Sequence, residues 1–524
     1  MNSIINKIKY EKTFFLLAPL LLLFLYISFI DVKYSVAADA TGKWQQTRDV
    51  ISKPLFDFSC SYQYNFDPMY KYIPGPSYFY FIDQGKCSHM YSYAFAYLLS
   101  PFLYFFSDYG IYFLNYLSWI IYIFSLANLA KLAILNNEKA YLYGGLFAIF
   151  VSPAIIYSIG FTEVTISFAL GAYSLYVVYA SLKNDSEKWN YAKLFLSGLI
   201  LGLIFSMRTE SIIYTASLCF ATFVYSISTN RGLPFLLKLF IPLTLGIIIG
   251  LGSVGVSHQI LFGNVTGFRG VNAMKVMKEG FSIQNQLEII RIQLFGGNRG
   301  LFTSIPLVLI SFLYFRPSIR NKFKQDGLFF ILIALMTTLL IVGTTPWGDF
   351  ADWTPRYLAL GFAPFFISVL QISLSDEASL LKKKIYKVIF VLLIIYSVLF
   401  NLTGVILTVK ITNLVKTVNL AIEKFNADSI VVDTLIPYIY ISQHNADKPI
   451  FSLNLSETDS VEKGKEKLQE LVQLLSTNKQ DRKILIIQIE GVSRFLFKGD
   501  EVENWNQKES FTLMKKIKFL LIEK

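Results

Sequence analysis

Residues 14–30 read FFLLAPLLLLFLYISFI, an uncharged apolar run that follows Lys7, Lys9 and Lys12. A helix needs about 20 mostly apolar residues to cross the hydrocarbon core of a bilayer, so this run predicts a first membrane span. The lysines before it place the N-terminus in the cytoplasm, because basic residues stay on that side. A cleaved signal peptide is the alternative, since residues 35–38 are small, but the apolar run is longer than signals usually have.

The composition of the whole chain also indicates a membrane protein. Of its 524 residues, 54% are hydrophobic and 16% are charged, whereas soluble proteins carry about 25% charged residues. The net charge of +12 would suit nucleic acid, but the basic residues form short clusters between apolar runs, as a bilayer imposes. We therefore expect an integral membrane protein whose partner is the lipid bilayer, with no nucleic acid.

Ten further apolar runs make about eleven spans in an all-α polytopic membrane protein. These runs are 111–130, 140–158, 164–182, 194–207, 212–228, 235–256, 301–315, 328–345, 357–374 and 386–409. Residues 91–106 are also apolar, but a span there would put the later basic loops on the wrong side of the membrane. We expect an interfacial helix at 91–106 instead, within a first outer loop at 31–110, and a transmembrane domain over 1–409.

The tail over 410–524 has mixed charges and shorter apolar runs. Runs at 429–432, 439–442 and 483–489 predict strands, and residues 460–476 have apolar side chains at helical spacing. A domain of about 100 residues can fold independently. We expect a small extracytoplasmic α/β domain, with no glycine-rich loop to indicate a nucleotide site.

Cysteine and histidine use is sparse. Cys60 and Cys87 both lie in the first outer loop, where oxidising conditions permit a disulfide. The sequence leaves their pairing open, because it does not give the Cα separation that a disulfide requires. His89 is expected to be a hydrogen-bonding side chain rather than a metal ligand, and no group of residues has metal-binding spacing.

Asp39 begins the polar run DATGKWQQTRD a few residues after the first span. A carboxylate in that place can face a substrate that arrives from the bilayer surface. The other aspartates of the loop are expected to be solvated, because exposed loops accept acids without a special reason.

Arg208 and Glu210 lie between two apolar runs. In a continuous helix, residues two apart do not share a face, so no ion pair between them is expected and Arg208 needs another anionic partner. The alternative is an arginine that extends to the membrane interface. Glu163 lies at the start of the fourth span. It either belongs to a functional site or is placed there because the N-terminus of a helix favours a carboxylate.

The loop WGDFADWTPRY, residues 347–357, is dense in tryptophan, acid and arginine. A guanidinium can hold a phosphate by two parallel hydrogen bonds, and tryptophan rings suit the depth at which a lipid phosphate lies. Arg356 is therefore a candidate for binding a lipid phosphate, with Asp352, Trp353 and Tyr357 beside it in the sequence. The alternative is an aromatic belt with a structural Asp–Arg pair.

These features together resemble the GT-C superfamily of polyprenyl-phosphate-sugar-dependent glycosyltransferases, especially the protein O-mannosyltransferases and the bacterial aminoarabinose transferases. The run from Asp39 through Asp49 is similar to the acidic helix of the family's first outer loop, and residues 88–110 to its interfacial helix. Arg208 corresponds to a basic residue at a helix break, and Arg356 to an outer-loop arginine motif. The resemblance covers about residues 10–410.

The resemblance implies an inverting transfer of a hexosyl or pentosyl group from a polyprenyl-phosphate donor to a hydroxyl of an envelope glycan, lipid or protein. Asp39 would be the catalytic base, and Arg208 and Arg356 would bind the donor phosphate. The residues implied to orient the substrates are Glu163, Asp352, Trp353 and Tyr357.

The resemblance also implies a multi-pass protein of the bacterial inner membrane, with its C-terminal domain outside the cytoplasm. It implies no cofactor, since the lipid-linked sugar is a substrate, and it leaves a divalent metal open. The alternative function is a transporter or flippase of a lipid-linked saccharide, although the paired halves common in transporters are not visible. A receptor or assembly protein that works through its tail is a third reading.

Overall fold

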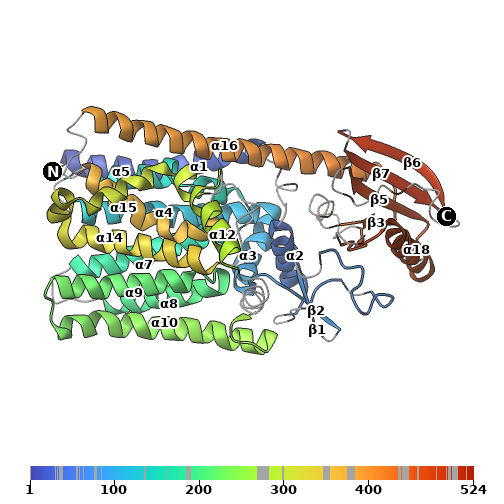
Figure 1. Cartoon of the computed structure of the whole chain (residues 1–524), viewed down its shortest axis with the longest axis horizontal. Coiled ribbons are helices and arrows are strands. Elements are labelled where there is room, and N and C mark those ends of the chain that lie inside the picture. The colour runs from blue at the N-terminus through green and yellow to red at the C-terminus, as the bar shows by residue number, and fades with distance from the viewer. Residues whose placement is uncertain are drawn as a thin grey trace. The chain divides into compact units, whose positions relative to one another are not determined.

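The computed structural model covers the full chain and divides it into two compact units (Figure 1). Unit 1 contains residues 1–26 and 109–407, and unit 2 contains residues 27–108 and 408–524. The structure describes all residues except 1, 30, 32–33, 35–38, 55–56, 58, 63, 76–78, 84, 135–136, 138, 161, 184–189, 268–281, 298–299, 346–354, 375–383, 435–437, 439–447, 457–458, 480, 491–492, 494–496, 498–504 and 515.

Unit 1 is a bundle of helices. Its elements are α1 (Asn2–Phe29), α4 (Gly110–Ala133), α5 (Ala140–Leu146), the π-helix η3 (Phe147–Val151), α6 (Ala154–Ser158), α7 (Val164–Lys183), α8 (Tyr191–Met207), α9 (Ser211–Ser228), α10 (Leu233–Phe262), α12 (Ile283–Phe295), α13 (Leu301–Ser304), the 3-10 helices η4 (Pro306–Phe315) and η5 (Arg356–Gly361), α14 (Pro317–Thr344), α15 (Phe362–Leu374) and most of α16 (Lys384–Glu423).

Within the described ranges, eight helical segments are long and apolar enough to cross a membrane, and three shorter apolar helices accompany them. Each of the eleven expected spans overlaps one of these segments, and one segment, Tyr93–Ala133, also contains most of the helix expected in the interface. The polytopic helical fold class, with a small sheet region at the C-terminus, is therefore confirmed.

Helices α8 and α10 run side by side and approach unusually closely (Figure 1). Gly198 and Gly202 of α8 face Gly246 and Gly250 of α10, and a Cβ at any of the four would collide with backbone atoms of the other helix. Small residues at this spacing let helices in a membrane approach and gain van der Waals contacts. The glycines therefore fix where the two helices cross.

The predicted span at 140–158 is not one helix. α5 passes into the π-turn η3, and the chain then turns at Ser152 and Pro153 before α6. Asn401 of α16 donates from Nδ2 to the carbonyl groups of Phe150, Val151 and Ser152 at 3.0–3.1 Å. The buried amide thus satisfies carbonyls that the break leaves without helical partners.

Unit 2 combines the first outer loop with the tail. Its elements are α2 (Asp39–Ser52), β1 (Tyr80–Asp83), β2 (Lys86–His89), α3 (Tyr93–Phe106), the short 3-10 helix η2 (Ser107–Tyr109), β3 (Ser429–Val432), β4 (Ile450–Ser452), α18 (Val461–Asn478), β5 (Lys483–Ile489), β6 (Asn506–Leu513) and β7 (Ile517–Glu523).

The main sheet has the order β4-β3-β5-β7-β6, and Figure 1 labels its strands β3, β5, β7 and β6. β3 pairs in parallel with β4 and β5, while β7 is antiparallel to both β5 and β6. β3 and β5 are almost wholly buried, as strands with near-continuous apolar runs are. The exposed β6 carries lysine and glutamate at the sheet edge, where charges oppose edge-to-edge association.

The strands predicted at 429–432 and 483–489 are present as β3 and β5, and the predicted helix is α18, capped by the Ser460 side chain. The strand predicted at 439–442 lies outside the described residues. The predicted helix at 91–106 is α3, which starts after Ser92 and ends at Ser107, where φ is +50°. Its position in the membrane interface stays a prediction.

The division into units differs from the predicted one, which placed residues 31–110 with the transmembrane domain. The outer loop packs against the tail: Ser452 N donates to Tyr72 O at 2.9 Å, and Asn454 Nδ2 donates to Ile73 O at 2.8 Å. Lys71 also pairs with Glu470 of α18. Contacts between segments so distant in sequence leave no local signal, so the sequence pattern did not reveal them.

Candidate functional site

Arg208 lies at a break between two helices of unit 1. α8 ends at Met207, Arg208 has an extended backbone, and α9 begins at Ser211. The Arg208 N–H donates to Ile204 O at 2.8 Å and so closes α8. A guanidinium at this place is also favoured by the negative end of the helix dipole.

The Arg208 guanidinium is buried between two carboxylates. Its Nη2 donates to Glu210 Oε1 at 2.7 Å, and its Nη1 lies 3.7 Å from Oε1 of Glu163. Glu163 is the residue just before α7. Burying a charge is costly unless it is paired, and these contacts supply the pairing. The expectation that Arg208 and Glu210 do not pair is wrong, because the helix breaks between them and side chains two residues apart can then meet.

Arg356 and Tyr357 join Arg208 from a third segment. The Arg356 carbonyl accepts a hydrogen bond from Arg208 Nη2 at 3.4 Å. The Tyr357 ring centroid lies 5.2 Å from Cζ of Arg208 and also 5.2 Å from Cζ of Arg356, within the range of cation–π attraction. We call Glu163, Arg208, Glu210, Arg356 and Tyr357 the Arg208 cluster.

The Arg208 cluster brings together four residues that the sequence singled out separately. Two guanidiniums and two carboxylates balance in formal charge, which makes their burial possible. The guanidinium fork suits the bidentate binding of phosphate, and carboxylates suit sugar hydroxyls. Asp352 and Trp353, predicted for the same loop as Arg356, lie outside the described residues.

Asp39 is the first residue of α2 in unit 2. A carboxylate in the first turn of a helix is stabilised by the positive end of the helix dipole. Further along α2, Gly42 packs under the ring of Tyr91 so closely that a Cβ would collide with it. The helix is therefore seated firmly in the unit, although the environment of the Asp39 side chain lies outside the described structure.

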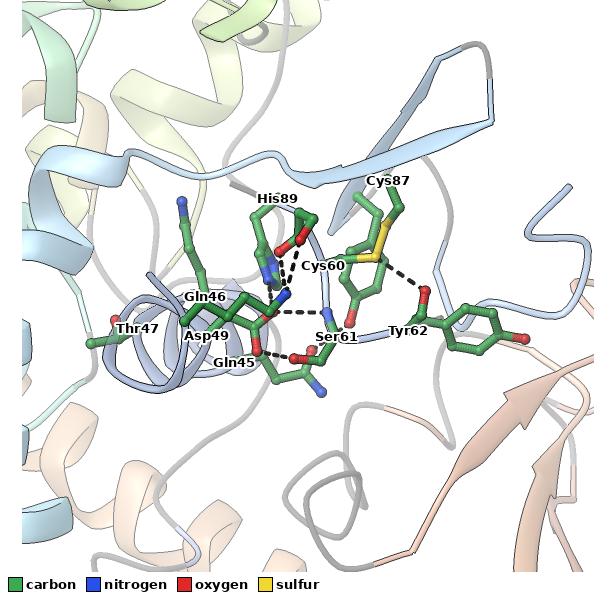
Figure 2. Close-up of polar contacts among 12 residues, drawn as sticks. Gln45, Gln46, Thr47, Asp49, Cys60, Ser61, Tyr62, Cys87 and His89 are labelled. Atoms are coloured by element: carbon green, nitrogen blue, oxygen red, sulfur yellow. Dashed lines mark hydrogen bonds and ion pairs between the residues drawn. A yellow bond between two sulfur atoms is a disulfide. The ribbon is translucent and has the colours of Figure 1, made fainter. Parts of the chain in front are cut away.

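A second polar cluster surrounds Asp49, near the end of α2 (Figure 2). Asp49 Oδ2 lies 2.7 Å from His89 Nε2 and accepts from the Ser61 N–H at 2.9 Å, while the Ser61 hydroxyl bonds to Oδ1. Lys53 Nζ is 3.6 Å from Oδ2. We call Asp49, Ser61 and His89 the Asp49 cluster.

The Cys60–Cys87 disulfide stands beside this cluster (Figure 2). Ser61 directly follows Cys60, and His89 follows Cys87 by two residues. The Cys60 N–H also donates to Cys87 O at 3.0 Å. The disulfide thus holds together the two segments that supply both partners of Asp49.

Burial alone would raise the pKa of Asp49, because it disfavours the charged carboxylate. The hydrogen bonds from His89 and Ser61 and the charges of His89 and Lys53 outweigh that effect, so the pKa of Asp49 lies below its ordinary value. Asp49 is therefore a buried, ionised hydrogen-bond acceptor at neutral pH.

The sequence reasoning placed Asp49 in the acidic run but gave it no partner. His89 was expected to form a hydrogen bond, and it does so with Asp49. The signal available was the position of Ser61 and His89 beside the two cysteines. Across the described ranges, no three His, Cys, Asp or Glu side chains are grouped so that they could hold a metal ion.

Comparison with known proteins finds similarity in structure only. No family model and no curated protein matches the sequence. The crystal structure of ArnT from Cupriavidus metallidurans, bound to undecaprenyl phosphate, matches over 97% of both chains with 9% identity and a TM-score of 0.52. The oligosaccharyltransferase of Archaeoglobus fulgidus, in complex with Zn and sulfate, matches over 89% of this chain and 67% of that chain, with 12% identity and a TM-score of 0.45.

The GT-C resemblance expected from the sequence is therefore confirmed for the fold, over 97% of both chains.

Proposed function

We propose that this chain is a membrane glycosyltransferase that moves a sugar from a polyprenyl-phosphate donor to an acceptor hydroxyl, with inversion at the anomeric carbon. The observation that carries the proposal is the fold shared with ArnT over 97% of both chains, because that structure was solved with undecaprenyl phosphate bound. The acidic helix α2 and the Arg208 cluster supply side chains suited to such a reaction.

Asp39 acts in this proposal as the general base. The acceptor oxygen attacks the anomeric carbon, the bond from that carbon to the phosphate oxygen breaks, and Asp39 takes the acceptor proton. Asp39 is the first residue of α2, and a general base needs hydrogen-bond reach to the proton that it takes. Inversion follows because a single displacement occurs on the face opposite the leaving phosphate.

Arg208 and Arg356 stabilise the negative charge that grows on the departing lipid phosphate. Arg208 is held by Glu210 and Glu163, so its position is fixed before the substrate binds, which is the condition for efficient electrostatic stabilisation. Arg356 is only partly buried, and its guanidinium would make the more direct contact with phosphate. Glu163, Asp352, Trp353 and Tyr357 would orient the sugar and the lipid head.

The reaction would take place on the extracytoplasmic face of a bacterial inner membrane, with the N-terminus in the cytoplasm and residues 410–524 outside. Lys7, Lys9 and Lys12, which precede the apolar run within α1, support this orientation. The Cys60–Cys87 disulfide in unit 2 supports it independently, because disulfides persist in oxidising compartments. The acceptor would be an envelope glycan, lipid or protein, and the sugar a hexose or pentose.

The test is a transfer assay with the purified protein in bilayer nanodiscs, radiolabelled polyprenyl-phosphate sugars and native membrane acceptors. The matched pair is Asp39→Asn and Asp31→Asn, because Asp31 lies nearby in the chain and forms an exposed ion pair with Lys416. We expect transfer with the unmodified and Asp31→Asn proteins and loss of transfer with Asp39→Asn. Repeating the assay with a chelator decides whether a divalent metal takes part.

Two results would count against the proposal. Undiminished transfer by Asp39→Asn would exclude Asp39 as the base. Label that crosses the bilayer of proteoliposomes while staying on its lipid would favour a flippase, and the assignments to Asp39 and the two arginines would fall with the enzyme.

A further inference from the structure

A pocket of about 600 Å³ lies within unit 2, apart from the first turn of α2. The α2 residues that line it begin at Trp44 and end at Ser52, while Asp39 is at the start of the helix. At 1.5 Å per residue, Asp49 is about 15 Å along the helix from Asp39. The lining residues are Trp44, Gln45, Arg48, Asp49, Ile51, Ser52, Ser61, Tyr62, Tyr80, His89, Leu103, Tyr104, Ser107 and Asp108.

The buried side of the pocket is held rigidly by hydrogen bonds. Tyr80 Oη donates to Gln45 Oε1 at 2.7 Å, and Gln45 Nε2 donates to Tyr438 Oη at 2.8 Å. The Asp49 cluster forms the adjoining part of this wall, tied to the Cys60–Cys87 disulfide (Figure 2). A wall whose polar groups already bond to one another is preorganised for a ligand.

One buried polar atom of this wall, Nδ1 of His89, does not share in these hydrogen bonds. His89 is 1% exposed, and its Nε2 is taken by Asp49. Its Nδ1 is buried and has no hydrogen-bond partner in the part of the chain that the structure describes. Because Nδ1 is enclosed, His89 supports the wall through its bond to Asp49 and does not present this atom to the pocket.

The exposed side of the pocket combines a flat aromatic ring with planar polar groups. Tyr104 at the end of α3 is 73% exposed. Arg48 lies over the Trp44 ring, with Cζ 4.6 Å from the centroid, and Trp44 Nε1 points to Asp108 Oδ1 at 3.4 Å. An aromatic face suits the apolar C–H face of a pyranose ring, while guanidinium and carboxylate groups suit its hydroxyls.

We propose that this pocket is a saccharide-binding site that holds the acceptor glycan at a sugar residue distant from the reacting hydroxyl. The volume is in the range of pockets that enclose small ligands, about 300 to 1,000 Å³. Tyr104 stacks on the sugar ring, and Arg48 and Asp108 bind its hydroxyls. The role toward the acceptor rests on the proposed function, whereas the binding of sugar does not.

A free phosphate is the other ligand that an exposed arginine could attract. The pocket carries Asp49 and Asp108 besides Arg48, and Asp49 is ionised. Two carboxylates in the lining disfavour an anion and favour a neutral polyhydroxyl ligand.

The experiment is saturation-transfer-difference NMR with the full chain in nanodiscs. The probes are the methyl glycosides of glucose, mannose, galactose and N-acetylglucosamine, with inorganic phosphate as competitor. The matched variants are Tyr104→Ala and Phe105→Ala, since both side chains lie on α3, with exposed fractions of 73% and 74%, and only Tyr104 lines the pocket. Arg48→Gln provides a second change in the lining.

We expect saturation transfer to the ring C–H protons of at least one glycoside with the unmodified and Phe105→Ala proteins, and at least tenfold weaker binding with Tyr104→Ala and Arg48→Gln. Absence of binding by all four glycosides, equal binding by Tyr104→Ala, or full displacement by phosphate would overturn the proposal. Sugar binding in a protein that transfers no label would leave the pocket in place and remove the proposed function. Label transfer without sugar binding would leave the proposed function in place and remove the saccharide-binding site.

Discussion

The Arg208 cluster and the Asp49 cluster both bury charge, but they compensate it in different ways. Arg208 is paired with two carboxylates, Glu163 and Glu210, that come from different segments. Asp49 is surrounded mainly by hydrogen-bond donors, from Ser61 and His89, with Lys53 at the margin. The first cluster thus consists of paired ions, and the second of one ion bound by dipoles and a histidine.

This difference bears on what each cluster can do. The guanidinium of Arg208 has more N–H donors than its two carboxylate partners use, and Arg356 is only partly buried, so both can contact a phosphate while Glu163 and Glu210 keep Arg208 in place. The donors around Asp49 already occupy both carboxylate oxygens. Asp49 is therefore suited to fixing the wall of a pocket and the position of His89 rather than to accepting a proton from a substrate.

The largest effect is expected from Arg208→Ala. Removing the guanidinium leaves two buried carboxylates without their cation, and breaking a buried ion pair in this way costs about 3 to 5 kcal/mol. Thermal unfolding in detergent should show a large fall in melting temperature, with a smaller fall for Arg208→Lys, which keeps the charge. Arg291→Ala is the control, because Arg291 pairs with Glu288 at an exposed position. Equal melting temperatures for Arg208→Ala and Arg291→Ala would contradict the buried pairing.

The next effect concerns the disulfide beside the Asp49 cluster. The double variant Cys60→Ser, Cys87→Ser opens a loop with a sequence separation of 27 residues, and the loss of that constraint should cost about 3 kcal/mol. Cys219→Ser, at a cysteine outside the disulfide, is the control. Melting curves should separate the two, and a double variant as stable as the control would show that the disulfide does not support the loop.

Asp49→Asn should have a moderate effect. The amide keeps one acceptor but loses the charge that strengthens the bonds from Ser61 and His89, and a hydrogen bond to a charged group contributes about 1.5 to 3 kcal/mol. We expect a destabilisation of about 2 kcal/mol, together with weaker glycoside binding. Asp57→Asn is matched in type and loop, and it should change glycoside affinity little, because Asp57 does not line the pocket. Identical glycoside affinities for the two variants would show that the Asp49 cluster does not contribute to binding in the pocket.

Acidification should reproduce part of that loss. The pKa of Asp49 is below its ordinary value in the folded protein, so its contribution is fully present above the unfolded pKa of about 3.9 and is lost as the pH falls through the folded pKa. The difference in melting temperature between the unmodified and Asp49→Asn proteins should be constant above about pH 5 and shrink below about pH 4. A difference that instead grows on acidification would show that the sign of the pKa shift is wrong.

The smallest effect is expected from Lys416→Gln, which removes an exposed ion pair to Asp31 in unit 2. Exposed pairs contribute about 0 to 1 kcal/mol. The change in melting temperature should be near the experimental error and should vanish in high salt. A loss as large as that of Arg208→Ala would remove the contrast between buried and exposed pairs.

Much of the fold followed from local patterns. The eleven apolar runs, the strands at Ser429–Val432 and Lys483–Ile489, and the helix after Ser460 can all be read from hydrophobic length and period. β6 was missed because its sequence NQKESFTL is polar and lies at a sheet edge. β4 was missed because three residues are too few to show a period.

The candidate site followed only in part. Glu163, Arg208 and Arg356 were each visible, because a charge beside an apolar run needs a reason. Their meeting was not visible, and neither was the partner Glu210, since both depend on the helix break at Arg208. The pair of Asp49 and His89 was hidden for another reason, because forty residues of chain separate the two.

By itself, the sequence determined that this chain has many runs apolar enough for a membrane and that a small α/β region follows them, because a bilayer and a hydrophobic core both select residues by local period. Only the tertiary structure decided that the outer loop folds with the tail, that four glycines seat α8 against α10, and that Arg208 and Asp49 find their partners. Such contacts join residues far apart in the chain, and their energy depends on distance and burial, which no local pattern encodes.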